Sequence, residues 1–503
     1  MYKTKKLYFP TKYALLFTLP LIAVGVFACF FMVLKDAYNI FGLLGYAAKT
    51  VTGLAVISSK LSSKAKLSWL FLTLVFPYAA IPAYLIFCPS RLSKKEKIII
   101  DEIKSKAPKS EHFNTKIELK CNEDFAFLKE ISNFSNFKIY KNTLATHIDN
   151  AKKMKELLLD DIKRARRFIF LEFYTVSSGD FFGEICEELI KKAAEGVEVR
   201  IIYDELGSLF RIPEEFTLAM KEKNIRALSQ ASLTGIFPSG INNRNHRKIA
   251  IIDGEIAYTG GINLADEYID PPKRLKEWKD SAARLEGEAV DELTYTFLAD
   301  YVLISGETED FSPYYKYKRK RCEGAMIPFS DGPSPIYSRR ISKMIILSLI
   351  SGAERELIIS TPYLVCDGDV LYALENAVRR GVKIGIVIPS RADRVLAGIL
   401  TKTYAQRLIE AGVAVYEYTP GFIHSKLYMA DGRYLLTGTV NLDCRSLDHN
   451  FENGILFLSH PVINEVAVDL RKIFESSKLI ERRKTPLFKM LLGAFIEVFA
   501  PLF

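Results

Sequence analysis

Two segments of the chain carry the same polar side chains at the same spacing. The first is NHRKIAIIDGEIAYTGGIN, whose histidine, lysine, aspartate and final asparagine are His246, Lys248, Asp253 and Asn263. The second is IHSKLYMADGRYLLTGTVN, in which the same four residue types are His424, Lys426, Asp431 and Asn441. In both, the lysine follows the histidine by two residues, the aspartate follows the lysine by five, and the asparagine follows the aspartate by ten. One such segment would predict only a strand and a turn, but two matched copies indicate a shared function.

Two histidines and two lysines around one point would form a site for a phosphate group. Lysine ammonium groups neutralise phosphate oxygens, and asparagine side chains add hydrogen bonds. A neutral, oriented imidazole is a nucleophile, and a second, protonated imidazole can protonate a leaving alkoxide. This combination suits cleavage of a phosphodiester through a phosphohistidine, after which the roles reverse as a new hydroxyl enters. Each histidine then needs a partner that orients its ring.

The elements around the two segments repeat as well. Residues 166–204 and 355–390 both contain an apolar run, an amphipathic run that ends in glycine, and a second apolar run. This order is typical of a strand–helix–strand unit on a parallel sheet. In each half the histidine segment follows later, and its Asp-Gly pair predicts a hairpin turn. Asp253 and Asp431 are predicted to belong to the catalytic set with the histidines and lysines, and the alternative is a mainly structural role, because Asp-Gly favours such turns without any catalysis.

The repeat therefore predicts a duplicated α/β protein. We expect two similar α/β/α halves, residues 110–311 and 322–482, packed about a pseudo-twofold axis. Such an axis would bring the two histidine–lysine pairs face to face in one site.

The first 92 residues are predicted to form a membrane anchor with two or three hydrophobic segments. Hydrophobic residues make up 49% of the chain, and the mean hydropathy is +0.08. Residues 13–34 and 67–88 carry no charge and are each long enough to cross about 30 Å of hydrocarbon as transmembrane helices, and residues 40–58 are a weaker candidate. The flanking lysines and arginines favour a cytoplasmic catalytic part. Residues 486–503 predict an apolar, interfacial helix at the end of the chain.

The remaining composition limits the kinds of partner and site. The net charge of +10 favours an anionic partner, such as a membrane surface or nucleic acid. The seven cysteines show no zinc-ligand spacing, so neither a metal site nor a disulfide framework is predicted.

Glu172 lies in an apolar run, where it either supports the lysine pair or lies at a strand edge. The basic segment 312–321 is either a solvated linker or a contact for anionic lipid. The histidines outside the repeat are expected to be surface or packing residues: His112, His147, His449 and His460.

The two H-x-K-x4-D segments resemble those of the phospholipase D superfamily, and their surroundings resemble the bacterial cardiolipin synthases. The similar stretches are GGINLADEY and KEWKDSAARLEG after the first motif and RSLDHNFENG after the second. The hydrophobic N-terminal segments and the apolar tail also match. One departure is Thr439, at a position where serine is common, and it keeps the hydroxyl.

The resemblance implies a role for each residue of the site. In the superfamily a carboxylate beyond each motif hydrogen-bonds the imidazole, and Asp280 and Glu452 lie 34 and 28 residues past His246 and His424. By analogy with relatives, His246 would be the nucleophile and His424 the acid. Neither a metal nor an organic cofactor is implied. Phosphate would be bound by one residue set from each half: His246, Lys248 and Asn263, with His424, Lys426 and Asn441.

The resemblance also implies a reaction in a bacterial cell membrane. A phosphatidyl group would move from one phosphatidylglycerol to another, giving cardiolipin and glycerol, with anionic lipids as partners. Phospholipase D and phosphatidylserine synthase, which use water or serine as the acceptor, are alternatives. A membrane-tethered nuclease would also fit the basic charge, but the apolar segments argue against it, so no nucleic-acid partner is expected. A non-catalytic scaffold should have lost a histidine or a lysine, and none is lost.

Overall fold

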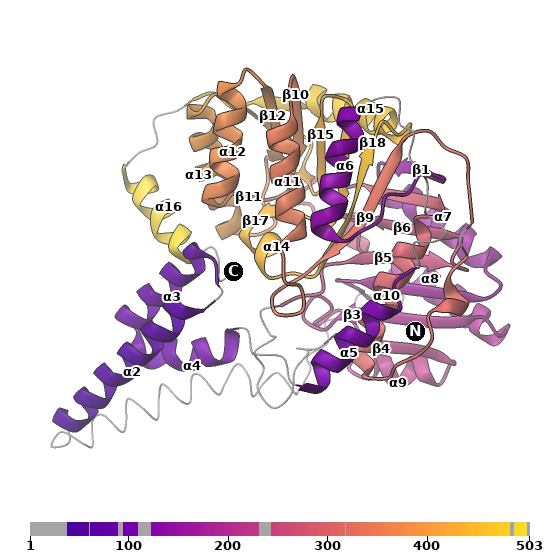
Figure 1. The fold of residues 1–503 in the computed structure, drawn as a ribbon, viewed down its shortest axis with the longest axis horizontal. Helices are drawn as coiled ribbons and strands as arrows, with labels where there is room; N and C mark the ends of the chain where they lie inside the picture. The colour runs from indigo at the N-terminus through magenta and orange to yellow at the C-terminus, as the bar shows by residue number, and fades with distance from the viewer. Residues whose placement is uncertain are drawn as a thin grey trace.

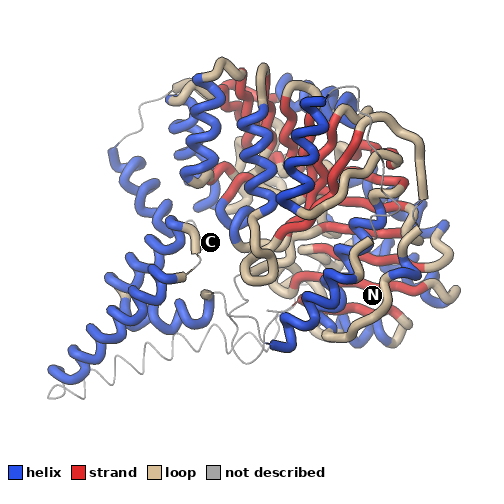
Figure 2. The backbone as a smooth tube through the Cα atoms, viewed as in Figure 1, coloured by secondary structure: helices blue, strands red, loops and turns tan. Residues whose placement is uncertain are grey.

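The computed structural model describes residues 38–59, 61–88, 94–108, 122–230, 243–316, 318–482 and 487–499. Two β-sheets with helices on their outer faces form the body, and a group of helices projects from one side (Figures 1 and 2). The predicted first span, residues 13–34, lies outside the described residues. Helices that come before the first strand or after the last strand in the chain are α2 (Tyr38–Ser58), α3 (Ser63–Val75), α4 (Pro77–Phe87), α5 (Lys94–Ser105), α6 (Asn122–Ser135) and α16 (Leu487–Phe499).

The first half is built on a seven-stranded sheet with the order β1-β8-β6-β5-β2-β3-β4. Strands β2, β3 and β4 are parallel, and the other neighbours are antiparallel. The elements in chain order are β1 (Thr143–Ile148), α7 (Ala151–Arg164), β2 (Phe168–Phe173), α8 (Asp180–Ala194), β3 (Glu198–Asp204), α9 (Phe216–Lys221), β4 (Ile225–Gln230), β5 (Lys248–Ile252), β6 (Ile256–Gly260), η3 (Asp266–Tyr268), β7 (Trp278–Lys279), β8 (Ala282–Gly287), α10 (Val290–Ser305) and η4 (Ser312–Tyr314).

The second half repeats this topology in an eight-stranded sheet with the order β9-β18-β16-β15-β10-β12-β13-β19. Read in this direction, its first seven strands match those of the first half one for one, and β19 is an added antiparallel edge strand. The duplication predicted from the repeated motif is therefore confirmed. The elements are β9 (Ala325–Asp331), α11 (Ile341–Gly352), β10 (Glu356–Ser360), β11 (Leu364–Val365), α12 (Gly368–Arg379), β12 (Lys383–Pro389), α13 (Val395–Glu410), β13 (Ala414–Tyr418), β14 (Phe422–Ile423), β15 (Leu427–Ala430), β16 (Tyr434–Gly438), β17 (Leu442–Asp443), α14 (Cys444–Asp448), β18 (Glu452–Leu458), α15 (Val462–Glu475) and β19 (Ser477–Leu479).

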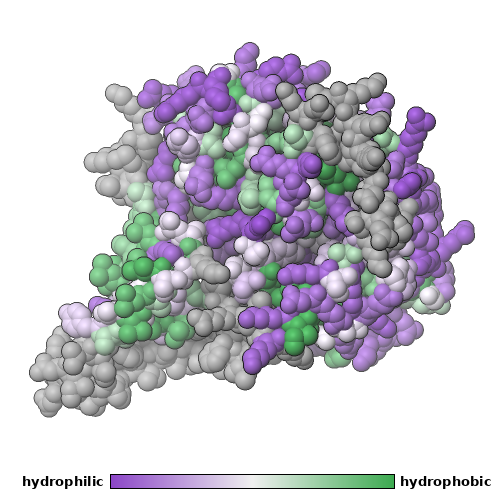
Figure 3. All heavy atoms as spheres, viewed as in Figure 1, coloured by the Kyte–Doolittle hydropathy of each residue, from purple (hydrophilic) through white to green (hydrophobic). Residues whose placement is uncertain are grey.

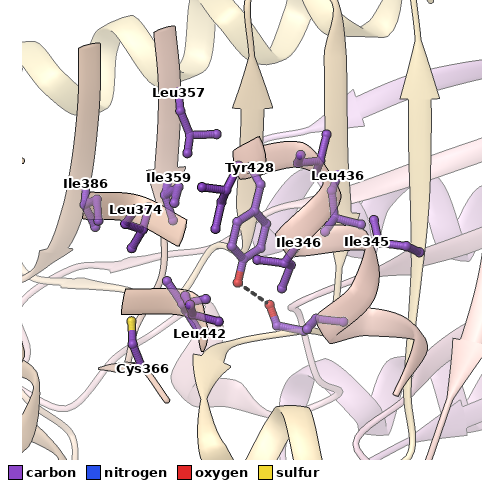
Figure 4. Close-up of a cluster of buried hydrophobic side chains, with 14 of the residues drawn as sticks. Ile345, Ile346, Leu357, Ile359, Cys366, Leu374, Ile386, Tyr428, Leu436 and Leu442 are labelled. Carbon is purple, nitrogen blue, oxygen red and sulfur yellow. Dashed lines mark hydrogen bonds between the residues drawn. The ribbon is translucent and has the colours of Figure 1, made fainter. Parts of the chain in front are cut away.

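Both faces of each sheet are buried, which explains why the central strands are almost continuously apolar. Along β2, Ile169, Leu171 and Phe173 face the outer helices α7 and α8, whereas Phe168 and Phe170 face the other half. In the second half, Leu357 and Ile359 of β10 face α11 and α12 in the same way (Figure 4). The Tyr428 hydroxyl in that core donates to the carbonyl of Val440 over 3.0 Å.

The two halves share one core between the inner faces of their sheets. It joins residues of β2 and β5 to residues of β15 and β18, and it includes apolar side chains of α10 and α15. Residues 122–139, although they fall within the predicted first half, pack on the second, because Leu128 and Ile131 belong to its core. The halves therefore form one continuous body, and a site at their junction has walls from both halves.

The predicted span at residues 67–88 is wrong as a single helix, because it breaks at Phe76 into α3 and α4. Pro77 lacks an N–H and disfavours helical geometry in the preceding residue, and Phe76 has φ −128° and ψ 58°. The chain folds back, so Trp69 and Tyr84 meet with their ring centroids 5.3 Å apart. None of the helices among the described residues is both long and apolar enough to cross a membrane.

Helix α16 joins the N-terminal helices to the second half. Glu497 accepts hydrogen bonds from Tyr404 (2.6 Å) and Arg407 (2.7 Å) of α13, and Lys64 of α3 lies 3.3 Å from the same carboxylate. Lys64 also donates to the carbonyl of Cys366 over 3.1 Å. We call α2, α3, α4 and α16 together the apolar platform.

Candidate active site

The two Asp-Gly pairs form hairpin turns at the ends of β5 and β15 that are remote from the histidines. Asp253 and Asp431 adopt left-handed backbone conformations, with φ 55° and 56°. The Asp253 carboxylate accepts hydrogen bonds from the backbone N–H groups of residues 166, 167 and 168, and Asp431 does the same with residues 354, 355 and 356. These aspartates therefore fix each hairpin to the start of the central strand, and the structure does not bring them to the imidazoles.

The remaining residues of the two motifs meet at one cavity between the halves. Its volume is about 550 Å³, and its walls include His246, Asn263, His424 and Asn441. Lys248 and Lys426 lie behind the histidines, each 1% exposed, and each ammonium group donates to the carbonyl of the preceding histidine. The pseudo-twofold axis thus assembles the predicted site from both halves.

Each imidazole is held by a carboxylate from the opposite half. His246 Nδ1 lies 2.9 Å from Glu452 Oε2, and His424 Nδ1 lies 2.6 Å from Asp280 Oδ2. Sequence reasoning found both carboxylates but assigned each to the histidine that precedes it in its own half. That assignment is wrong, because the structure exchanges the partners.

The backbone explains the exchange. Strand β14, which directly precedes His424, pairs in parallel with β7, which directly precedes Asp280. On the other side of the axis, the N–H of His246 donates to the carbonyl of Phe451 over 2.9 Å, next to Glu452. Short inter-half pairings therefore place each histidine beside the other half's carboxylate. These pairings join segments far apart in sequence, so spacing along the chain could not predict them.

The carboxylates determine which imidazole nitrogen is available for chemistry. An ionised carboxylate only accepts hydrogen bonds, so each Nδ1 carries the proton that it shares with Glu452 or Asp280. Nε2 of each ring is then a lone-pair donor available to a substrate. This is the tautomer that nucleophilic attack on phosphorus requires.

Burial strongly shifts the titration of all four basic residues. Burial lowers the pKa of His246 to about 4, against the opposing effect of Glu452, and the pKa of His424 to about 4, with Lys426 adding to the effect. Burial also lowers the pKa of Lys248 to about 7 and that of Lys426 to about 8. The site therefore contains two neutral imidazoles and two buried lysines, whose charged forms an entering phosphate would stabilise.

Glu452 is held in its ionised form by several donors. Burial would raise its pKa, but His246, Lys248 and the donated hydrogen bonds outweigh burial and lower the pKa. Thr439 donates a hydrogen bond to this carboxylate, and Ser446 does so over 2.6 Å. The threonine at the position where serine is common therefore supplies the hydroxyl that the site uses.

Residues missed from the sequence break the symmetry of the cavity. Arg244, two residues before His246, corresponds to Phe422, two residues before His424. Arg445 and Glu267, each four residues past its motif asparagine, also differ in charge. Arg394 is a third arginine in the cavity lining, and Tyr174 also lines the cavity with its ring centroid 5.2 Å from that of His246. The signal that could have revealed Arg244 and Arg445 is their position next to the motifs, without a counterpart in the other copy.

The side of His424 is aromatic instead. Trp278 and Phe422 lie with their ring centroids 5.4 Å and 5.6 Å from the His424 ring. Trp278 occupies the position that corresponds to Asn450, since each lies two residues before its carboxylate. The two imidazoles therefore have similar pKa values but different neighbours.

The other candidate residues lie outside the cavity. Glu172 is buried on the central strand β2 and accepts from Asn245 over 2.5 Å, so it supports the segment before His246 and is neither at a strand edge nor against the lysines. His147 and His460 are buried packing residues that bond to Asp469 and to the carbonyl of Thr143.

The basic linker between the halves is tied to the first half. Lys318 pairs with Glu255, Arg319 with Glu288, and Lys320 with Glu286 over 2.7 Å. These cations therefore pair with acidic residues of the first half while their side chains remain 34–65% exposed, as expected for a solvated linker.

Comparison with known proteins places this geometry in a family. The family described as "Cardiolipin synthase, PLD-like domain" matches residues 158–274 and 346–477, one block in each half. An uncharacterized protein of Streptococcus mutans is 31% identical, with 89% of this chain and 99% of that protein covered. Cardiolipin synthase 2 of Bacillus anthracis is 30% identical, covering 82% of this chain and 81% of that protein. A cardiolipin synthase of Halalkalibacterium halodurans is 31% identical, covering 80% and 81%.

A solved structure has the same fold. Phosphatidylserine synthase from Haemophilus influenzae superposes with a TM-score of 0.58 at 14% identity, covering 76% of this chain and 98% of that chain. Its similarity is therefore one of architecture. Taken with the duplicated sheets and the paired histidine–lysine motifs, the matches show that this chain belongs to the cardiolipin synthase family of phospholipase D-like proteins.

Proposed function

We propose that this protein is a cardiolipin synthase, a phosphatidyltransferase that joins two phosphatidylglycerol molecules and releases glycerol. The observation that carries the proposal is the pair of buried, neutral imidazoles in one cavity, each oriented by a carboxylate and backed by a lysine. This arrangement provides one nucleophile, one proton donor and a charge-neutralising surround for a phosphodiester. The relatives named cardiolipin synthase supply the choice of lipid.

In the first step, Nε2 of His246 attacks phosphorus and the bond to the glycerol oxygen breaks. His424, protonated in the substrate complex, gives its Nε2 proton to that oxygen, so glycerol leaves as a neutral alcohol. The entering phosphate provides the negative charge that favours this protonation, because the free site keeps the pKa of His424 near 4. Lys248, Lys426, Asn263 and Asn441 hold the phosphoryl oxygens.

In the second step the roles reverse. The terminal hydroxyl of a second phosphatidylglycerol gives its proton to His424 and attacks the phosphohistidine. The bond between phosphorus and His246 breaks, which gives cardiolipin and returns both imidazoles to their starting state. Glu452 and Asp280 keep the two rings aligned throughout and stabilise the charge that each ring carries in turn.

We place the enzyme at the bacterial cell membrane, with its catalytic part on the cytoplasmic side. The apolar platform supports this placement, because large apolar side chains on it remain in contact with solvent (Figure 3). Among them are Leu54, Leu67, Leu74, Phe76, Leu85 and Phe495, which are 57–73% exposed. Through α16 the platform holds α13, and the first residues of α13 line the cavity, so lipid could pass from the bilayer to the site.

The function can be tested in vesicles that contain the full chain and labelled phosphatidylglycerol, without added metal. We expect cardiolipin and glycerol from the wild type and no cardiolipin from His246→Ala or His424→Ala. If the reaction is stopped after the first step, the labelled phosphatidyl group should remain attached to His246, where mass spectrometry can locate it. Phosphatidic acid as the sole product would instead indicate a hydrolase, and salt-sensitive cleavage of nucleic acid would indicate a nuclease.

A further inference from the structure

The cavity contains a second group of cations that the phosphohistidine chemistry leaves unused. Arg244 precedes β5, Arg394 precedes α13, and Arg445 lies in α14, yet all three line one side of the same cavity. We infer that Arg244, Arg394 and Arg445 form a second phosphate subsite, which holds the phosphodiester of the lipid that accepts the phosphatidyl group. The inference rests on the proposed function, because only a reaction between two phospholipids brings two phosphodiesters into one cavity.

The position of the subsite suits a glycerol headgroup. Tyr174 lines the same cavity as the three arginines, and its ring centroid lies 5.2 Å from that of His246. One aromatic side chain therefore separates the subsite from the reacting centre. In phosphatidylglycerol, three carbon atoms separate the phosphate from the terminal hydroxyl, so a phosphate held beside Tyr174 leaves that hydroxyl free to reach the phosphohistidine.

Asp204, Asp393 and Asp443 lie near these arginines, and each also accepts hydrogen bonds from other groups. Asp204 lies 3.8 Å from Arg244, and Asp393 lies 3.9 Å from Arg394. Asp204 is already engaged by the backbone N–H groups of three residues, and Asp393 accepts from the hydroxyl of Tyr363. The pKa of Arg445 remains below its ordinary value, mainly because it is buried and also because Arg244 and Arg394 are close. A bound phosphate would relieve this destabilisation and offer planar guanidinium groups a bidentate partner.

The pseudo-twofold axis does not repeat Arg244 or Arg445 in the other half. The other half has Phe422 in place of Arg244 and Glu267 in place of Arg445, and Glu267 pairs with Arg211. A symmetric phosphate site needs no such difference. A transferase that attacks only one of its two phosphodiesters needs two unlike subsites, and the asymmetry provides them.

Apolar side chains continue from the subsite toward the platform. Val395 and Leu396, directly after Arg394, line the cavity and are 77% and 43% exposed. They begin α13, whose later residues Tyr404 and Arg407 hold α16. A lipid whose phosphate binds the arginines would therefore have its acyl chains beside an apolar surface that leads to the platform.

The test compares acceptors with and without a phosphate. The full-length protein is placed in vesicles of labelled phosphatidylglycerol and phosphatidylcholine, and two reactions are followed: cardiolipin formation, and exchange of the lipid headgroup with deuterated glycerol from solution. We expect Arg394→Gln and Arg445→Gln each to slow cardiolipin formation by about tenfold or more, since a charge-assisted hydrogen bond contributes roughly that factor. Glycerol exchange, which needs only one phosphodiester, should change by less than about threefold.

The matched control is Arg226→Gln, which removes the same charge from a side chain on β4 that is 66% exposed and outside the cavity lining. If the arginine variants slow cardiolipin formation and glycerol exchange by the same factor, or slow neither reaction, the assignment of the second phosphate subsite is wrong. A wild type that exchanges glycerol but never makes cardiolipin would overturn the proposed function and the subsite with it, so the two failures are distinguishable. Arg394 is largely exposed, so its variant keeps the test valid if Arg445→Gln does not fold.

Discussion

Glu452 orients the imidazole of His246 although 206 residues and a domain boundary separate them. The reciprocal contact joins Asp280 to His424. Each catalytic histidine is therefore complete only when the opposite half is docked. This relationship makes the interface between the halves part of the active site.

Because each histidine contacts the carboxylate of the opposite half, the structure predicts which imidazole each carboxylate orients. Glu452→Gln should lower kcat by about 10²-fold to 10⁴-fold, because the amide no longer fixes the productive tautomer. Histidine side-chain NMR of this variant should show a changed tautomer at His246, while His424 keeps its signals. Glu410→Gln, on an exposed position of α13, is the control. A change centred on His424 would contradict the exchanged pairing.

Activity should fall on the alkaline side at an unusually low pH. Lys248 and Lys426 are proposed to bind phosphate in their ammonium forms, and burial lowers their pKa values to about 7 and 8. As pH rises through these values the site loses its cations, so kcat/KM should decline above pH 7. In the substrate complex the phosphate favours the charged lysines, so the decline in kcat should occur at higher pH. Profiles of kcat and kcat/KM that coincide would argue against lysine titration.

Stability of the free protein should also depend on pH. Both histidines have folded-state pKa values of about 4, below the ordinary value of 6.5, so the unfolded chain binds more protons between these values. Folding free energy should therefore be lost as pH falls from 6.5 toward 4.

Inorganic phosphate or tungstate, bound between the cations, should raise the thermal unfolding midpoint of the wild type more than that of Lys248→Met. Equal shifts in both proteins would place the anion elsewhere.

The motif aspartates should matter for stability more than for chemistry. Asp253→Asn keeps a residue type that tolerates φ 55° but weakens the acceptor for three backbone N–H groups. We expect the free energy of unfolding to fall by about 1–3 kcal/mol, while kcat of the folded enzyme stays within about twofold. Denaturant unfolding and lipid assays on the same preparation would measure both quantities. Asp160→Asn, exposed on α7, is the control, and a large selective loss of kcat would contradict the structural role.

The apolar platform should determine membrane binding. Replacing Leu74, Phe76 and Leu85 together by glutamate should sharply reduce flotation with vesicles, because it places charges on side chains that are 57–73% exposed and would contact hydrocarbon. Leu144→Glu, at a side chain of β1 that is 42% exposed on the catalytic body, should leave flotation unchanged. Unaltered flotation of the triple variant would remove the role proposed for these helices.

Local patterns in the sequence were sufficient to predict much of the fold. The repeated strand–helix–strand units and the Asp-Gly hairpins depend on periodicity and turn chemistry, which act over a few residues. The contacts that decide the chemistry depend instead on how the two halves dock. The pairing of β7 with β14, the cationic wall around Tyr174 and the break at Phe76 all follow from tertiary geometry or from a single proline.

The inter-half docking has a consequence for biosynthesis. A nascent chain that has emerged through η4 contains His246, Lys248 and the whole first sheet, but not Glu452. Its histidine has no carboxylate to set the tautomer, and its phosphate pocket lacks one wall. The enzyme therefore becomes able to break phosphodiester bonds only after translation has passed β18 and the halves have closed. A truncated product that keeps one intact motif should therefore be harmless to phospholipids.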